Sequence, residues 1–368
     1  MRSSTASVPK RYRRYRRRDA LLNTPSRLGA DALLEAALTG SADSPRSALS
    51  GCPCLLVDLG PRASLNAGEP AALSRWLSRQ ACPVIGIAAD GIAHPLACGC
   101  DAVAGSIEDA NDLLTNIAAA PLAALVLVQL LRATEGLDVS RALTFESLAY
   151  ATLQAGAEFQ GWLARGGRPA TRPATEPGPP VLLERQGAQL RLRLNRPGRR
   201  NALSVEMRDA LVEALELVAA DASITAVTLS GAGRCFSAGG DLTEFGSAPD
   251  PATAHAVRST RSVPALLACC AARLRFRVHG AAVGAGAEMA AFGGRVEATA
   301  DAFFQLPEIR YGLIPGSGGC VSIPRRIGRL RTAHLALSAR RLDARTALAW
   351  GLIDALTESA TLAAVTGT

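Results

Sequence analysis

The protein has 368 residues, of which 48% are hydrophobic, 20% charged and 4% aromatic. A chain of this size and composition forms one large or two ordinary globular domains, so disorder throughout is excluded. The longest apolar stretch, residues 117–131, is 15 residues long and contains Pro121 and Gln129. A membrane helix needs roughly 18 to 20 residues, so we predict no membrane span.

The charge of the chain is concentrated at its start. The net charge is +8, and residues 1–18 alone contain eight basic residues and no acidic one. The rest of the chain is therefore neutral overall, and nothing indicates a basic face that binds nucleic acid. We expect residues 1–39 to form a basic, disordered tail, with contact to RNA or anionic lipid as the alternative. The tail lacks the apolar segment of a secretory signal, so we expect a cytoplasmic protein.

Lysine and cysteine usage excludes several classes of chemistry. Lys10 is the only lysine, and the other 39 basic residues are arginines. Schiff-base, pyridoxal and Walker-type mechanisms need a lysine within the fold, so these classes are excluded. The nine cysteines are an odd number, which suggests reduced thiols. Their C-x-C pairs lack the spacing of common zinc sites, so we expect no metal.

The chain order of elements predicts two α/β regions. Short apolar runs predict buried parallel strands at Cys54–Leu59 and Pro83–Ala88. Helical patterns follow at Leu113–Ala133 and Ala142–Ala164. Residues 165–180 then contain five prolines and three glycines, which predicts a linker between a domain at 40–164 and a domain at 181–368.

The second domain begins with a predicted hairpin. Its strands are Val181–Glu184 and Leu190–Leu194, followed by a helix at Ser204–Ala220 that Ser204 caps and by a strand at Ile224–Ser230. The strand Arg273–Val278 leads directly into a glycine-rich stretch, residues 280–288. Such a turn places bare backbone amides beside whatever is bound. Strands that alternate with helices indicate an α/β fold.

Six motifs in this domain resemble the enoyl-CoA hydratase/isomerase (crotonase) family in their order and spacing. They are Asn195–Leu203, Phe236–Leu242, Gly280–Glu288, Phe304–Glu308, Gly312–Gly319 and Arg341–Asp354. The resemblance covers about residues 181–355. It implies a crotonase-like (ClpP/crotonase) spiral of ββα units in the second domain, with the first domain as a separate α/β region.

The resemblance implies a chemistry that holds a thioester enolate without water. Two backbone amides bind the enolate oxygen in this family, and the matching motifs assign them to Ala238 and Ala285. The matching glutamates are Glu288, which orients and activates water, and Glu308, which transfers a proton at the α-carbon. We expect the two carboxyl groups to share a water, with Glu288 at a helix start and Glu308 on a neighbouring loop.

The resemblance also implies residues that bind the substrate. They are Arg200, Ala202, Gly239, Gly240, Asp241 and Gly284. An arginine at position 199 or 200 can pair with a phosphate of coenzyme A, and an ordinary surface charge is the alternative. For Asp241 we favour a role in fastening its own turn. No separate cofactor is implied, because coenzyme A is part of the substrate.

The implied reaction is syn hydration of a 2-enoyl-CoA to a 3-hydroxyacyl-CoA, a step of fatty acid metabolism, by a homo-oligomer that binds an acyl-CoA thioester. The alternatives are other enolate reactions of the family, namely isomerisation, decarboxylation and thioester hydrolysis. A catalytically silent subunit is an alternative of a different class.

The chain departs from the family pattern at both ends. It stops 14 residues after Asp354, where the family continues into a helical segment that covers the acyl pocket. We expect Leu113–Ala133 and Ala142–Ala164 to supply this cover. Residues 82–91 and 100–105 faintly resemble the family's central strands, and residues 146–162 its late helices. The first domain is therefore predicted to be a degenerate, non-catalytic copy of the fold, with an unrelated α/β domain as the alternative.

Overall fold

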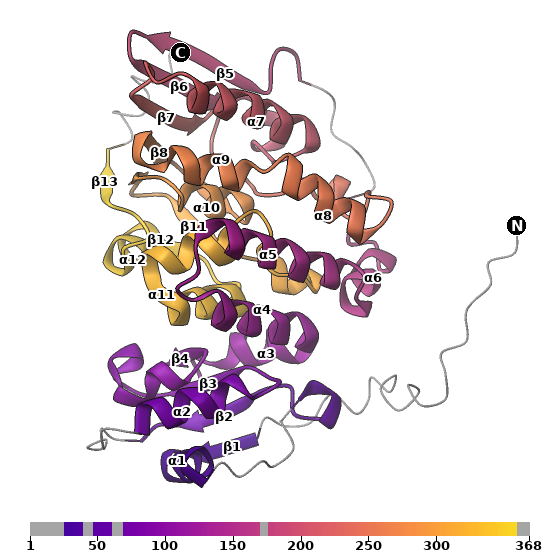
Figure 1. Cartoon of the computed structure of the whole chain (residues 1–368), viewed down its shortest axis with the longest axis vertical. Helices are drawn as coiled ribbons and strands as arrows, with labels where there is room; N and C mark the ends of the chain where they lie inside the picture. The colour runs from indigo at the N-terminus through magenta and orange to yellow at the C-terminus, as the bar shows by residue number, and fades with distance from the viewer. Residues whose placement is uncertain (1–25, 40–46, 61–68, 170–175, 359–368) are drawn as a thin grey trace, which may run out of the picture. The chain divides into compact units, whose positions relative to one another are not determined.

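The computed structural model describes residues 26–39, 47–60, 69–169 and 176–358. The chain divides into two compact units after Leu125 (Figure 1). Most of the predicted basic tail, residues 1–25, lies outside the described residues. Its last part differs from the prediction, because Ser26–Gly29 form strand β1 and Ala30–Thr39 form helix α1.

The first unit contains a parallel sheet of four strands in chain order. They are β1, β2 (Leu55–Asp58), β3 (Val84–Ile87) and β4 (Ala102–Ala104). Helices α2 (Glu69–Ser78) and α3 (Asn111–Ala119) belong to the same unit. The two predicted strands are confirmed as β2 and β3, whose first three residues are buried in each case.

The second unit is built on a six-stranded sheet with the order β13-β10-β8-β7-β6-β5. The strands are β5 (Val181–Gln186), β6 (Gln189–Leu194), β7 (Ala226–Gly231), β8 (Leu274–Val278), β10 (Arg295–Thr299) and β13 (Ala355–Thr357). The predicted hairpin is confirmed, because β5 and β6 pair antiparallel, and all other pairs are parallel. This α/β arrangement agrees with the predicted fold class.

A smaller sheet places the two predicted glutamates. Strands β9 (Ala281–Val283) and β11 (Phe303–Gln305) run parallel, and β12 (Leu342–Asp343) pairs antiparallel with β11. The chain passes from β9 into helix α10 (Ala285–Ala290), and from β11 into the 3-10 helix η9 (Glu308–Tyr311). Because the carboxyl ends of parallel neighbours meet at one edge, Glu288 and Glu308 follow adjacent strand ends.

Five further helices of this unit lie between or after its strands. They are α7 (Val205–Ala220), α8 (Pro251–Thr260), α9 (Val263–Cys270), α11 (Gly319–Ser338) and α12 (Ala344–Trp350). The predicted helix start at Ser204 is confirmed, since its side chain accepts a hydrogen bond from the Met207 amide at 3.2 Å. The apolar stripe predicted in its sequence is buried, at Met207, Leu211, Ala214, Leu215 and Val218.

Each of the two predicted long helices is broken in two. Residues 113–133 form α3 and α4 (Pro121–Thr134), and residues 142–164 form α5 (Val139–Gln154) and α6 (Ala157–Ala164). Pro121 starts α4 because proline fits the first turn of a helix but cannot continue one. No single helix in the described part of the chain is long and apolar enough to span a membrane; only the bent pair of α3 and α4, taken together, has the length and composition.

The boundary of the compact units differs from the predicted linker at 165–180. Helices α5 and α6 belong to the second unit, where α5 contacts α8, α9 and α11 (Figure 1). Apolar packing explains the difference, because Phe159 of α6 is fully buried and Trp162 stacks on it and contacts the Tyr311 ring of η9. Residues 142–164 therefore pack within the second unit, whereas the other predicted covering segment, residues 113–133, contains the boundary between the two units.

Candidate functional site

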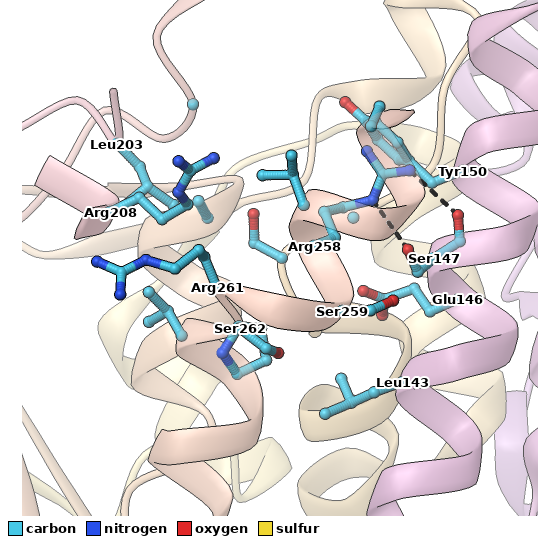
Figure 2. A pocket seen from close by; sticks show the side chains of 18 of the residues that line it. Leu143, Glu146, Ser147, Tyr150, Leu203, Arg208, Arg258, Ser259, Arg261 and Ser262 are labelled. Carbon is cyan, nitrogen blue, oxygen red and sulfur yellow. Dashed lines mark hydrogen bonds between the residues drawn. The ribbon is translucent and has the colours of Figure 1, made fainter. Parts of the chain in front are cut away.

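The second unit contains a cavity of about 800 Å³. Helices α5, α8 and α9 form its walls, together with α10, η9 and residues 240–249 (Figure 2). Glu288 and Glu308 both line it. The cavity therefore brings together the two glutamates that the sequence singled out.

Glu288 is the fourth residue of α10 and is buried. Its Oε2 accepts hydrogen bonds from the amides of Ser317 at 2.7 Å and Gly319 at 2.8 Å. Its Oε1 accepts none from the residues that the structure describes, so one oxygen is free to face a ligand in the cavity. Burial raises the pKa of this carboxyl to about 7, although the two amides act in the opposite direction.

Glu308 begins the 3-10 helix η9 and is also buried. Its Oε2 has no hydrogen-bond partner within the described chain. Its Oε1 lies against Gly284, where a Cβ atom would collide with it. Burial raises the pKa of Glu308 well above its usual value, and the nearby charge of Glu288 raises it further. Gly284 has φ of +48°, so both conformation and space require glycine there.

The predicted oxyanion pair is wrong for one of its two amides. The Ala238 amide donates to the carbonyl of Arg200 at 2.9 Å, so it is not free to bind a substrate oxygen. The cause is local, because Arg200 has φ of +51°, which turns its carbonyl toward residue 238. The amides of Gly239 and Asp241 are also bonded, to Ser237 Oγ and to the Leu203 carbonyl respectively.

The amides of Gly240 and Ala285 have no acceptor among the described residues, and both residues line the cavity. Their two segments run side by side, since the Val283 amide donates to the Ser237 carbonyl at 3.0 Å. Gly239 fits between them, and a Cβ there would lie 2.6 Å from the Val283 carbonyl oxygen. Among the described residues of these two segments, Gly240 and Ala285, and not Ala238, thus have amides without an acceptor at the cavity.

The predicted substrate-binding residues separate into two groups. Gly240 and Asp241 line the cavity, whereas the lining does not include Arg200, Ala202, Gly239 and Gly284. Asp241 accepts hydrogen bonds from the amide and hydroxyl of Thr243 and forms a buried ion pair with Arg199. This arrangement fixes the turn, as expected for Asp241, and engages Arg199. The Arg200 side chain is exposed.

Most of the residues that line the cavity were not predicted, among them Glu146, Tyr150 and Arg258. Glu146 and Tyr150 come from α5, and Arg258 comes from α8 (Figure 2). Arg258 donates to Ser147 Oγ at 3.0 Å and lies over the Tyr150 ring, 4.9 Å from its centroid. Burial lowers the pKa of Arg258. The available signal was the resemblance of residues 146–162 to the late helices of the family, which did not by itself place them at this cavity.

The site contains no arrangement of metal ligands in the described part of the chain. No group of three or more His, Cys, Asp or Glu side chains there is placed to hold a metal ion. The free amides can donate hydrogen bonds, and the buried carboxyl groups can transfer protons.

Comparison with known proteins finds relatives for the second unit. The family model described as enoyl-CoA hydratase/isomerase matches residues 184–366. A 2,3-dehydroadipyl-CoA hydratase from Escherichia coli (strain K12) is 36% identical over 174 residues, which cover 47% of this chain and 68% of the relative. A 1,2-epoxyphenylacetyl-CoA isomerase from the same strain is 37% identical over 194 residues, or 50% and 71% of the two chains.

Among solved structures, an enoyl-CoA hydratase from Mycobacterium smegmatis has 32% sequence identity and a TM-score of 0.47. The alignment covers 50% of this chain and 72% of the other.

Proposed function

Because the chain belongs to the enoyl-CoA hydratase/isomerase family, we propose that it adds water to a 2-enoyl-CoA and forms a 3-hydroxyacyl-CoA. One observation carries the proposal: two buried glutamates and two unbonded amides line one cavity. When the carbonyl oxygen of a bound thioester accepts hydrogen bonds from both amides, the negative charge of the enolate develops on that oxygen, where the amides stabilise it.

The proposed reaction uses each group once. Glu288, in its ionised form, accepts a proton from a water molecule, and the water oxygen bonds to the β-carbon. The electron pair of the double bond moves toward the thioester carbonyl, where the amides of Gly240 and Ala285 stabilise the oxygen. Glu308, in its protonated form, gives its proton to the α-carbon. The products are the 3-hydroxyacyl thioester, a protonated Glu288 and an ionised Glu308.

The environments of the two carboxyl groups support this division of roles. The pKa of Glu288 is raised by burial to about 7, and two amides stabilise its charged form. Burial and the charge of Glu288 raise the pKa of Glu308 well above its usual value, which keeps its proton available. Two carboxyl groups whose environments differ in this way provide a base and an acid at the same pH.

A panel of coenzyme A thioesters tests the proposal, with products identified by mass spectrometry. We expect 2-enoyl thioesters to gain the mass of water. Glu288→Gln and Glu308→Gln should each reduce turnover by roughly 100-fold or more, the usual contribution of a general acid or base. Glu216→Gln on the exposed face of α7 is the matched control and should retain activity. A product of unchanged mass with a moved double bond would instead indicate an isomerase, and the absence of any product a silent subunit.

The homo-oligomer and the cytoplasmic location expected from the sequence remain proposals. Light scattering of the purified full chain tests the first, and fractionation of cells that express it tests the second. A monodisperse monomer would remove the oligomer from the proposal.

A further inference from the structure

Two carboxyl groups share the amides at the start of helix α11 in strict alternation. Glu288 Oε2 accepts from the amides of Ser317 and Gly319. Glu146 accepts from the amides that lie between and after them: Oε1 binds Gly318 at 2.7 Å and Oε2 binds Cys320 at 2.8 Å. Four consecutive amides are thus held by two side chains that are far apart in the sequence.

These amides need partners from outside the helix. The first amides of an α-helix have no acceptor within the helix, and leaving such a group buried and unbonded is costly. The residue at the N-cap position of α11 is Gly318, with φ of +96°, and it has no side chain that could serve. The carboxyl groups of Glu146 and Glu288 therefore act as the cap of α11.

Glu146 is placed to cap α11. Its side chain is buried, and both of its oxygens are engaged by α11. Ser147, the next residue of α5, binds Arg258 and His255 of α8 (Figure 2). Helix α5 is therefore fastened on one side to α8 and, through Glu146, to the turn that holds Glu288.

We infer that Glu146 is a positioning residue for Glu288: by binding the alternate amides of residues 317–320, it fixes the turn that orients the free oxygen of Glu288 in the cavity. This inference rests on the proposed function, in which that oxygen takes a proton from water. Glu146 itself has no free oxygen and does not contact the reacting atoms.

The same placement gives Glu146 an electrostatic effect on the second glutamate. The charge of Glu146 raises the pKa of Glu308, in the same direction as the charge of Glu288. Burial and the charge of Glu288 also raise the pKa of Glu146 well above its usual value, so this repulsion acts where Glu146 is ionised. Replacing Glu146 by a neutral side chain removes the repulsion, and Glu308 should then lose its proton at a lower pH.

The test uses the full chain with Glu146→Gln, which keeps the shape of the side chain and one of its two acceptors. We expect kcat for the best thioester of the panel to fall by roughly 10- to 100-fold, with a much smaller change in KM. The basic limb of the pH profile should move to lower pH. Glu135→Gln is the matched control, because Glu135 also pairs with α11, through Arg329 at 3.3 Å, but is 64% exposed. It should change neither quantity.

Wild-type kcat and pH profile in Glu146→Gln would overturn the inference, as would a loss of activity with an unmoved profile. If the Gln variant does not fold, Glu146→Asp replaces it. This variant keeps the carboxylate charge but shortens the side chain by one methylene group, so kcat should fall while the basic limb of the pH profile stays in place. A wild-type kcat would again contradict the inference that Glu146 positions Glu288.

An activity-independent readout separates this inference from the proposed function. Infrared difference titration of the wild type and the Gln variant follows the band of protonated carboxyl groups. A lowered titration of a buried carboxyl in the variant supports the inference even where no thioester of the panel reacts. An unchanged titration of the remaining buried carboxyl groups contradicts it, whatever the activity.

Discussion

Two parallel sheets of this protein share one plan, but only one of them leads into a site. In the first unit β1 to β4 lie side by side in chain order, and in the second unit β6, β7, β8 and β10 do the same. In each case a glycine with positive φ follows the third strand, Gly91 at +58° and Gly280 at +55°. The connections to the fourth strand are similar in length, residues 88–101 and 279–294.

The difference lies in what the connection contains. The eighth residue after Gly280 is Glu288, in the cavity, whereas the eighth residue after Gly91 is Gly99. A Cβ atom at Gly99 would collide with the side chain of Leu73, so the corresponding space is filled by leucine. Both parallel sheets therefore bring the ends of their strands together. A site forms only where the segment after a strand leaves a cavity and places polar groups in that cavity. The shared plan supports the hypothesis of a degenerate copy, which stays a prediction.

The largest expected effect comes from removing the helices that cover the cavity. A fragment of residues 181–368 lacks α5 and α6, and so lacks Glu146 and the buried ring of Phe159. It should aggregate or lose activity by roughly 100-fold or more, since small displacements of catalytic groups are that costly. A fragment that begins at Pro121 retains both helices and should be soluble and active. Size-exclusion chromatography and a hydration assay check both fragments; an active, monodisperse 181–368 fragment would show that the helices are dispensable.

The second prediction concerns the amide at the start of α10. Ala285→Pro removes the N–H group, and proline is tolerated in the first turn of a helix. Losing one such donor costs about 3 to 4 kcal/mol of transition-state stabilisation, or roughly 100- to 1000-fold in kcat. Ala285→Gly retains the amide and is the control. Near-normal kcat in the proline variant, measured beside that control, would remove Ala285 from the oxyanion pair.

The sequence predicted much of the secondary structure around this site and fewer of the residues within it. The hairpin, the start of α7 and the strand β8 that leads into the glycine-rich stretch follow from apolar periodicity and capping, which are local properties. The Ala238 amide was assigned wrongly because it donates to the Arg200 carbonyl. That hydrogen bond depends on the left-handed backbone conformation of Arg200, which the side chains in this segment do not predict. Glu146 was missed because its partners lie more than 170 residues away, and only the fold brings them together.

The third prediction is the pH dependence of turnover. The proposed base, Glu288, must be ionised, and its pKa is raised to about 7, so activity should rise as the pH increases through this value. The proposed acid, Glu308, must be protonated, and its pKa is raised well above the usual value, so activity should fall at higher pH. A bell-shaped profile of kcat/KM is expected from stopped-flow or steady-state assays. A flat profile between pH 5 and about 9 would contradict these roles.

The smallest effect on activity is expected from a substitution in the first unit, at Gly99, where leucine fills the neighbouring space. Gly99→Ala adds a methyl group that would collide with Leu73 and approach Leu77, so the unit must shift to accommodate it. Overpacking of this kind usually costs about 1 to 3 kcal/mol of the free energy of unfolding. Every residue that lines the cavity lies beyond position 138, so kcat should stay at the wild-type value. Denaturant unfolding of the full chain and a hydration assay measure the two quantities together.

Gly233→Ala is a useful counterpart, because its added methyl group would meet Pro197 beside the turn that carries Arg200 in the second unit. A drop in kcat in Gly99→Ala, at a temperature where the chain is folded, would show that the first unit acts on the reaction and that the two sheets are less independent than their contents suggest.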